Sequence, residues 1–323
     1  MGAQFGVFVP QGWKMDLVGI GDPVAQYEAM TSVARAVDAL PAYDSIWLYD
    51  HFHTVPVPTM ETTFEAWTTT AALTRDTRRV HVGQMVTCNG YRNPALLAKM
   101  ASTVDVMSHG RLYCGLGAGW YEHEWRAYGY GFPETRDRMR SFREACEIVM
   151  KMWTEDGPTF GGAYHTINRP INEPKGARQP HPALWIGGSG EQVTLKLVAR
   201  YADACNINVD PEALKHKLDV LRGHCAALGR DYESIIRSHS FDVLPLRPGQ
   251  SAEQATTHIR AALGMTMDQL RNRAVIGTSA ELVEYLRPYA DAGINYFILY
   301  VPELAFDQEP LHQLAEEVIP HLS

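Results

Sequence analysis

Residues 111–120 read Arg-Leu-Tyr-Cys-Gly-Leu-Gly-Ala-Gly-Trp, an apolar segment that turns into a glycine-rich loop. We expect residues 112–116 to form a short buried strand. Gly115, Gly117 and Gly119 stand at alternate positions, and since glycine weakens a strand, another group is expected to approach this backbone closely. A strand that ends in such a loop is how parallel α/β folds present a ligand. The alternative is a tight turn that binds nothing.

Seven other apolar segments also have the length of short strands, and helical periodicity follows each one. This order predicts an α/β fold, a single-domain (β/α)₈ TIM barrel that spans residues 1–323. Residues 157–182 are rich in Pro and Gly, and we expect an irregular insertion there. The predicted strands are 4–9, 45–49, 80–86, 112–116, 183–186, 205–209, 240–246 and 296–301.

Composition limits the environment and the partners of the chain. Its 323 residues are 46% hydrophobic, enough for a sizeable core, yet no run of about 18 apolar residues or secretory signal pattern occurs. The net charge is −8 without a basic cluster, which argues against nucleic acid. Five scattered cysteines form no C-x-x-C pair. We therefore expect a cytoplasmic protein that binds neither membranes nor nucleic acid.

Polar and glycine-rich residues follow several predicted strands, and in a barrel these strand ends share one face. Residues 187–190, Gly-Gly-Ser-Gly, open a helix and are suited to a phosphate, because free amides and the helix dipole favour an anion. An ordinary helix-capping turn is the alternative. The other candidates are Asp50, His51 and His53, then residues 87–89, then residues 117–120.

Asp50 and His51 are the candidate acid–base pair, in which the carboxylate would orient or charge the imidazole. A purely structural pair is the alternative. His51 and His53 also have the H-x-H spacing of barrel metal hydrolases, but only His239 and Asp242 near the seventh strand are available as further ligands, so no metal is expected.

No G-x-S-x-G elbow occurs, and Cys114 lies within a predicted strand, so a nucleophilic mechanism has little support. An aromatic group near the fourth strand is suited either to wall a flat heterocycle or to pack the barrel rim. Its members are Trp120, Tyr121, Trp125, Tyr128 and Tyr130.

Taken together, these motifs resemble the bacterial-luciferase-like oxidoreductases, and most closely the branch that uses the deazaflavin coenzyme F420. The resemblance extends over nearly the whole chain. It is carried by residues 50–52, 86–94, 110–120, 185–190 and 197–203.

The resemblance implies a tricyclic ring across the barrel mouth, beside a non-prolyl cis peptide at Met85-Val86. Asp50 and His51 would lie near the ring, and the catalytic residues would be His51 and Asp50. A homodimer is also implied. The implied cofactor-binding residues are Asp50, His51, Met85, Val86, Thr87, Ala118, Gly119, Trp120, Gly187, Gly188 and Ser189.

One position departs from the family pattern. Trp120 stands where the F420-dependent sugar-phosphate and alcohol dehydrogenases have a catalytic glutamate, and Glu122 and Glu124 would project differently from a helix. We therefore expect reduction of an activated C=C or C=N bond rather than alcohol oxidation, with His51 or water as the proton donor.

Three other functions remain as alternatives. The first is an FMN-dependent monooxygenase that receives reduced FMN from a partner flavin reductase. The second is a non-catalytic flavin-binding protein, which would bind the coenzyme without turnover. The third is a metal-dependent hydrolase, which would contain stoichiometric zinc.

Overall fold

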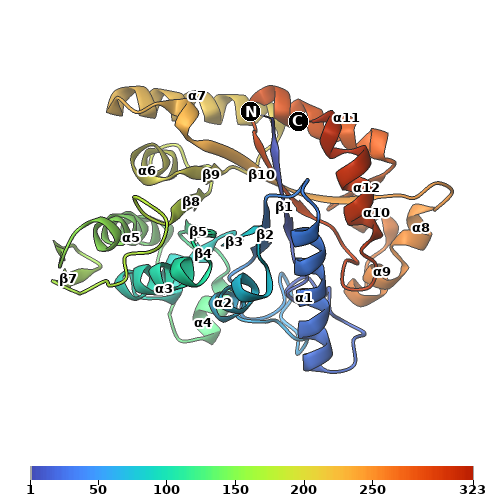
Figure 1. Ribbon diagram of the computed structural model, residues 1–323, viewed down its shortest axis with the longest axis horizontal. Helices are drawn as coiled ribbons and strands as arrows, with labels where there is room; N and C mark the ends of the chain where they lie inside the picture. The colour runs from blue at the N-terminus through green and yellow to red at the C-terminus, as the bar shows by residue number, and fades with distance from the viewer. Residues whose placement is uncertain (1, 323) are drawn as a thin grey trace.

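The computed structural model describes residues 2–322 and contains a closed parallel barrel with helices around it (Figure 1). The predicted (β/α)₈ barrel is therefore confirmed; the first and last residues of the expected domain 1–323 lie outside the described residues. Each barrel strand pairs in parallel with the next, and the last strand pairs with the first. Around the ring the strands are β1 (Gln4–Phe8), β2 (Ser45–Leu48), β3 (His81–Gln84), β5 (Leu112–Gly117), β8 (Ala183–Gly187), β9 (Ala204–Asn206), β10 (Ile236–Pro245) and β12 (Tyr296–Tyr300).

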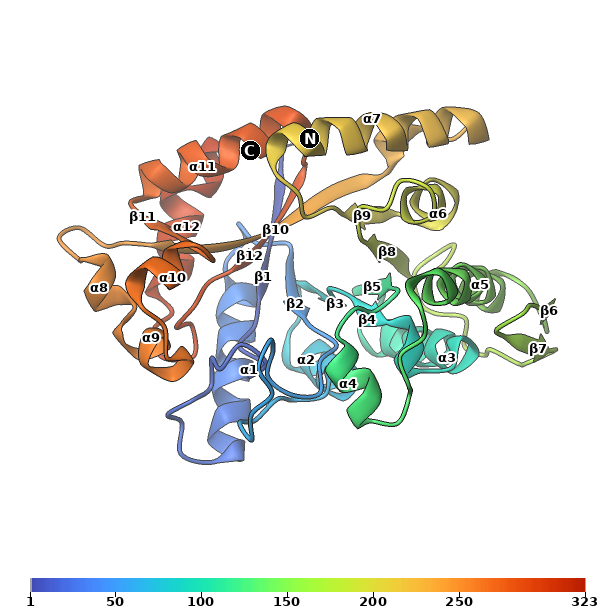
Figure 2. The same ribbon diagram turned by 180° about the vertical axis from the view of Figure 1, so that it is seen from behind.

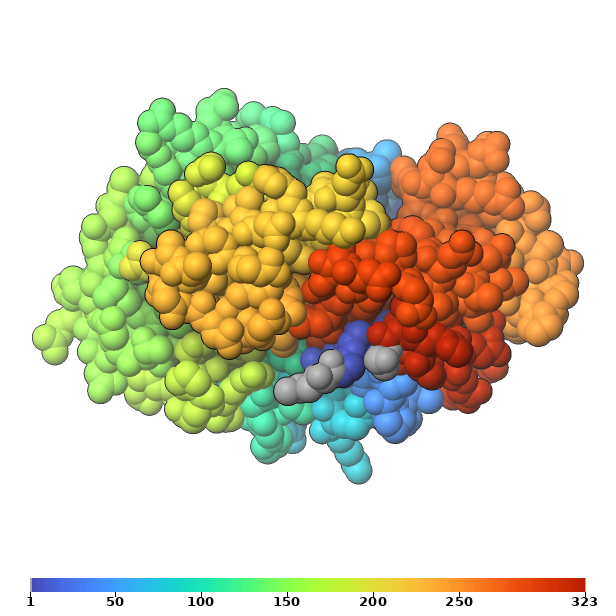
Figure 3. Space-filling model, turned by 90° about the horizontal axis from the view of Figure 1, so that it is seen from above, coloured from blue at the N-terminus to red at the C-terminus, as the bar shows by residue number. Residues whose placement is uncertain are grey.

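Helices return the chain from the end of each strand to the start of the next, as parallel pairing requires. One of these helices begins at Pro94, where the Asn93 side chain accepts hydrogen bonds from the first free amides. α7 and α11 lie side by side over one face (Figure 3). The outer helices are α1 (Pro23–Ala39), α2 (Ala66–Asp76), α3 (Pro94–Met107), α5 (Thr135–Thr154), α6 (Thr194–Tyr201), α7 (Pro211–Leu228), α11 (Ser279–Ala292) and α12 (Glu309–Glu317).

Successive side chains of each strand point alternately into the barrel and out toward the helices, so the core has an inner and an outer part. In β2, Trp47 points into the barrel and packs against Tyr113 and Trp185, while Ile46 and Leu48 face the helices. Aromatic side chains therefore fill the barrel interior below its mouth, and only the carboxyl ends of the strands remain open for a site. Within residues 2–322, no helix has the length and apolar character of a membrane span.

The third predicted strand, 80–86, is interrupted. β3 ends at Gln84, and a two-residue strand, β4 (Thr87–Cys88), pairs separately with β5. The Met85-Val86 peptide between them is cis, as the family resemblance implied. The seventh strand begins at Ile236, four residues earlier than predicted.

The expectation that the insertion at 157–182 has no regular element was wrong. It contains an antiparallel hairpin of β6 (Thr159–Gly161) and β7 (Thr166–Asn168). Three consecutive amides of its turn, residues 163–165, donate to the carboxylate of Glu144 on α5, which supplies order that three-residue strands lack. The hairpin lies at the opposite end of the molecule from α8 (Ala252–Ala255), α9 (Thr257–Leu263), α10 (Met267–Arg271) and the outer strand β11 (Val275–Gly277) (Figure 2).

Candidate active site

A cavity of about 410 Å³ opens at the carboxyl ends of the barrel strands. This is the face on which the sequence placed the candidate residues, and most of them line the cavity. The lining residues named from the sequence are Asp50, His51, Met85, Val86, Cys88, Gly117, Ala118, Gly119, Trp120, Tyr121, Gly187 and Gly188.

His51 is held by a glutamate that is fully buried. Its Nδ1 atom lies 2.9 Å from Oε2 of Glu124 on the short helix α4 (Glu122–Ala127), and the Glu124 side chain is 0% exposed. The Phe52 amide and the Tyr91 hydroxyl donate to the same carboxylate, at 2.7 and 2.9 Å. Burial raises the pKa of Glu124, but the hydrogen bonds from His51, Phe52 and Tyr91 outweigh burial and hold it below its ordinary value.

An ionised Glu124 accepts the Nδ1 proton of His51, which assigns the tautomer and leaves Nε2 as the basic nitrogen. The His51 side chain keeps 10% of its surface exposed, and it lines the cavity. Trp13 stacks on the imidazole with ring centroids 5.1 Å apart. The histidine is thus fixed on two sides and open to the cavity on a third, as a proton-transfer group requires.

Asp50 has a different set of contacts. Both of its carboxylate oxygens accept from the Arg92 guanidinium, at 2.7 and 2.9 Å, and Oδ2 also accepts from the Cys88 amide. The same guanidinium donates to Glu65, whose carboxylate caps α2. Asp50 therefore lies at the cavity wall with its oxygens already used, and it ties β2 to β4.

The close approach expected at the glycines of β5 is real, but the approaching group belongs to the protein. A Cβ on Gly115 would lie 1.8 Å from the Gln84 carbonyl oxygen, and one on Gly117 would lie 2.6 Å from a methyl of Val86. Gly187 on β8 leaves room for the same side chain. These glycines admit the bulge between β3 and β4, and Val86 becomes part of the cavity wall.

Two of the implied cofactor-binding residues do not line the cavity. Thr87 is fully buried, and its hydroxyl accepts from Trp67 Nε1 of α2. The bulge at Met85-Val86 interrupts the strand alternation, so that Thr87 faces the helix instead of the mouth. Ser189 lies in the loop after β8 but is not among the lining residues.

The loop after β8 leads to a helix start without a side-chain cap, so it is not an ordinary capping turn. Among residues 2–322 no side chain accepts from the first amides of α6, and the Leu195 amide donates to the Gly190 carbonyl. Gly188 has a φ of 123°, a conformation that side chains disfavour, and both Gly188 and Thr194 line the cavity. The other amides at this positive end of the helix dipole are suited to a phosphate.

The possible metal ligands lie apart. His53 contacts the Thr54 carbonyl and His123, and His239 contacts the Val209 carbonyl. Asp242 pairs with Lys14 at 2.7 Å. No group of three or more metal-ligating side chains occurs in the described part of the chain.

The aromatic group divides between the cavity lining and packing at the barrel rim. Trp120 and Tyr121 line the cavity, whereas Tyr128 packs on Phe52. Trp125 and Tyr130 in the same way pack on Tyr91.

Several lining residues were not predicted. Trp13 follows β1, Tyr49 follows β2, and Asn208 follows β9, so a search of every predicted strand end would have found them. Cys88 was a candidate, but burial and the Asp50 carboxylate raise the pKa of its thiol to about 12, so it stays protonated. The remaining unpredicted lining residues are Tyr91, Met139, Thr194, Asn206 and Ser240.

Comparisons with known proteins place this chain in a family. Over 308 residues the chain is 28% identical to the F420-dependent glucose-6-phosphate dehydrogenase of Amycolatopsis mediterranei (strain U-32), covering 86% of this chain and 90% of that protein. It is 31% identical over 138 residues to the FMNH(2)-dependent dimethylsulfone monooxygenase of Pseudomonas putida, covering 42% and 38%. These relatives confirm the expected enzyme class, an oxidoreductase.

A solved structure, an F420-dependent secondary alcohol dehydrogenase in complex with an F420-acetone adduct, has a TM-score of 0.77 and 21% identity, over 100% of both chains. That likeness supports the fold. Residues 3–266 match the family model described as luciferase-like monooxygenase. Because this match covers most of the sequence, the chain belongs to the luciferase-like monooxygenase family.

Proposed function

We propose that this protein binds coenzyme F420 at the mouth of its barrel and transfers a hydride between the coenzyme and a small uncharged organic substrate. The observation that carries the proposal is the His51–Glu124 pair, fixed at the wall of a cavity that continues to the uncapped start of α6. The relative from Amycolatopsis mediterranei, which the chain matches over most of its length, is named for the same coenzyme.

The residues present fit a planar group that carries a phosphate. Val86, Ala118 and Gly119 would support the ring, and Trp120 would flank its edge. The amides beyond Gly188 would hold the phosphate. We assign Met85 and Gly187 to the cavity wall and Ser189 to the phosphate loop. Asp50 and Thr87 would hold that wall in place through their hydrogen bonds to Cys88 and Trp67.

The bound coenzyme would supply or accept the hydride, and the protein would contribute orientation and electrostatics. His51 is the proposed proton donor. With Nδ1 bound to Glu124, its Nε2 takes up a proton from water and passes it to the substrate atom that becomes electron-rich. Because Glu124 lies behind His51 and is fully buried, it positions the histidine and does not replace the glutamate absent at position 120. We therefore favour reduction of an activated C=C or C=N bond.

The cavity also suggests a substrate class. None of its described lining residues is Lys or Arg, and the nearby Lys14 is paired with Asp242. A phosphate ester would need a cationic or multiple-amide site of its own, beside the one assigned to the coenzyme. Asn206, Asn208 and Ser240 instead line the cavity with neutral polar groups, and Asn206 lies directly beside the phosphate loop, since its carbonyl accepts from the Gly188 amide. We therefore propose an uncharged substrate, unlike that of the sugar-phosphate relative.

Titration with oxidised and reduced F420, and separately with FMN, tests the coenzyme through fluorescence quenching. Micromolar binding of F420 without comparable binding of FMN is the expected result. Tight binding of FMN alone, together with oxygen consumption when reduced FMN is supplied, would favour the monooxygenase alternative. Turnover with glucose 6-phosphate at the level of uncharged substrates would contradict the substrate class.

We also propose a homodimer in the cytoplasm. The homodimer follows from the family resemblance, and the location is consistent with five free, buried cysteines. Light scattering of the purified protein, which separates a mass of 36.1 kDa from twice that mass, tests the dimer.

A further inference from the structure

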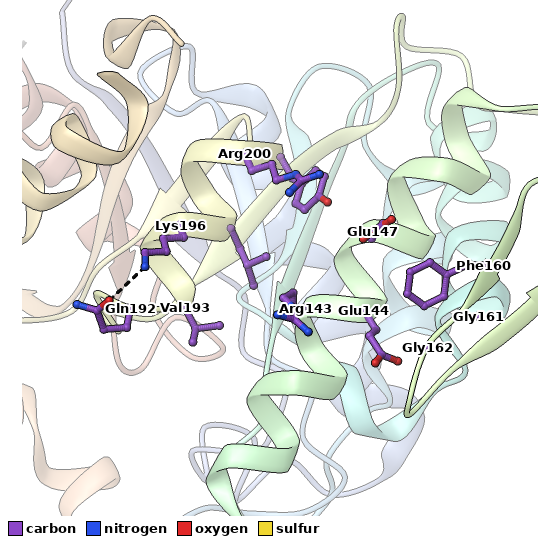
Figure 4. A pocket seen from close by; sticks show the side chains of 12 residues that line it. Arg143, Glu144, Glu147, Phe160, Gly161, Gly162, Gln192, Val193, Lys196 and Arg200 are labelled. Carbon is purple, nitrogen blue, oxygen red and sulfur yellow. Dashed lines mark hydrogen bonds between the residues drawn. The ribbon is translucent and has the colours of Figure 1, made fainter. Parts of the chain in front are cut away.

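A second cavity, of about 670 Å³, lies between α5 and α6 beside the β6–β7 hairpin (Figure 4). Its walls carry three cationic side chains, Arg143 from α5 and Lys196 and Arg200 from α6. We call this cavity the basic groove. Glu144 and Glu147 also line it, but the amides of residues 163–165 already bind the Glu144 carboxylate.

The two arginines of the basic groove are available to a ligand. Neither Arg143 nor Arg200 forms an ion pair or a side-chain hydrogen bond with the described residues, and the Arg200 guanidinium lies 5.2 Å from the Tyr201 ring centre. Lys196 donates to Gln192 at 3.2 Å, at the outer edge of α6 (Figure 4). Guanidinium groups without acidic partners are suited to carboxylates, which they can bind through two parallel hydrogen bonds.

The basic groove begins where the coenzyme cavity ends. On α5, Met139 lines the coenzyme cavity, and Arg143, one helical turn later, lines the groove. On the opposite wall, Thr194 lines the coenzyme cavity while Val193 and Leu197 line the groove. An extended molecule held at the start of α6 would therefore pass directly between the two helices.

We propose that the basic groove binds the acidic tail of the coenzyme, with Arg143 and Arg200 pairing with its carboxylates. This inference rests on the proposed function. Beyond its phosphate, F420 carries a chain of glutamates, whose carboxylates are ionised at neutral pH, whereas FMN ends at its phosphate. The groove would then contribute affinity and selection for the tailed coenzyme without touching the reacting atoms.

The experiment compares F420 that carries several glutamates with the same coenzyme lacking them, by fluorescence quenching in low and high salt. The native protein should bind the tailed form roughly five- to tenfold more tightly, because each of two exposed ion pairs raises the affinity by only a small factor. The advantage should disappear in the double variant Arg143→Gln/Arg200→Gln and in high salt. Arg271→Gln/Arg273→Gln is the control, since it changes the net charge equally at exposed positions outside the groove.

The outcomes separate this inference from the function on which it rests. Equal affinity of the native protein for the two forms would overturn the groove's role and leave F420 binding intact. The groove's role would also be overturned if the affinity of the double variant falls by the same factor for both forms, or if its circular dichroism spectrum changes. Failure of both forms to bind would overturn the proposed function, and this inference with it.

Discussion

Glu124 is buried beneath His51 and accepts hydrogen bonds from a histidine, an amide and a phenol. Replacement by glutamine would keep the acceptor for the Phe52 amide. The new NH₂ group would face Nδ1 of His51. Because this NH₂ group can only donate, Nδ1 would have to accept, and the imidazole proton would move to Nε2. This change, in a residue that does not line the cavity, would then leave Nε2 facing the cavity with a bound hydrogen in place of its basic lone pair.

For Glu124→Gln we expect turnover to fall at least roughly tenfold and the pH–rate profile to shift, while coenzyme affinity changes less than about threefold. Stability should fall by about 1–3 kcal/mol, since charge-assisted hydrogen bonds are lost. Steady-state kinetics across pH and urea unfolding measure these effects.

Glu122→Gln is the matched control, because Glu122 lies two residues away on the same helix, is 54% exposed and, among the residues that the structure describes, pairs with Arg126 alone. It should leave turnover unchanged. If both variants turn over like the native protein, Glu124 has no positioning role.

At the scale of elements, the junction of β3, β4 and β5 forms the wall of the cavity. The Gln84 carbonyl and the Val86 side chain fill the space that side chains would occupy at Gly115 and Gly117. The wall is therefore built by one strand pressing its backbone onto another, which only glycine permits at these positions.

Gly115→Ala should destabilise the protein by more than about 3 kcal/mol, because its Cβ would meet a backbone oxygen that cannot rotate away. Gly223→Ala on α7 is the comparison, since nothing lies within 4 Å of a Cβ there. That variant should gain about 0.5–1 kcal/mol from helix propensity. Thermal unfolding of the two variants measures both changes, and equal melting temperatures would contradict the packing described for β5.

The strands and most of the residues that line the cavity could be predicted from the sequence, because local sequence patterns determine where they lie. Apolar runs mark the strands, and the glycines of β5 mark a close approach. The pair of His51 and Glu124 joins residues 73 positions apart, which no local pattern reports. Thr87 was misplaced because a bulge resets which side a residue faces, and the β6–β7 hairpin was missed because Glu144, from another element, holds it.

At the scale of the whole molecule, the dependence of stability on pH reflects groups that are buried in one protonation state. His239 in β10 is buried against Phe241 and Tyr289, and burial lowers its pKa from 6.5 to about 4. The unfolded chain therefore binds this proton first as the pH falls. The neutral imidazole makes its full contribution to the free energy of unfolding above pH 6.5, and this contribution is lost as the pH falls toward 4.

Urea unfolding of the native protein and of His239→Gln, from about pH 7.5 to about pH 4.5, measures this contribution. The difference in unfolding free energy between the two proteins should shrink by about 2 kcal/mol over that range, because glutamine cannot take up the proton. A difference that stays constant with pH would show that His239 titrates normally in the folded protein.

Arg92 gives the molecule one more property. Its single guanidinium holds Asp50 after β2, Glu65 at the start of α2 and, through Asp50, the Cys88 amide of β4. These partners come from successive βα units, so this part of the cavity wall forms only when those units have docked. We therefore expect these two units to dock and this part of the cavity wall to form in one cooperative step during folding.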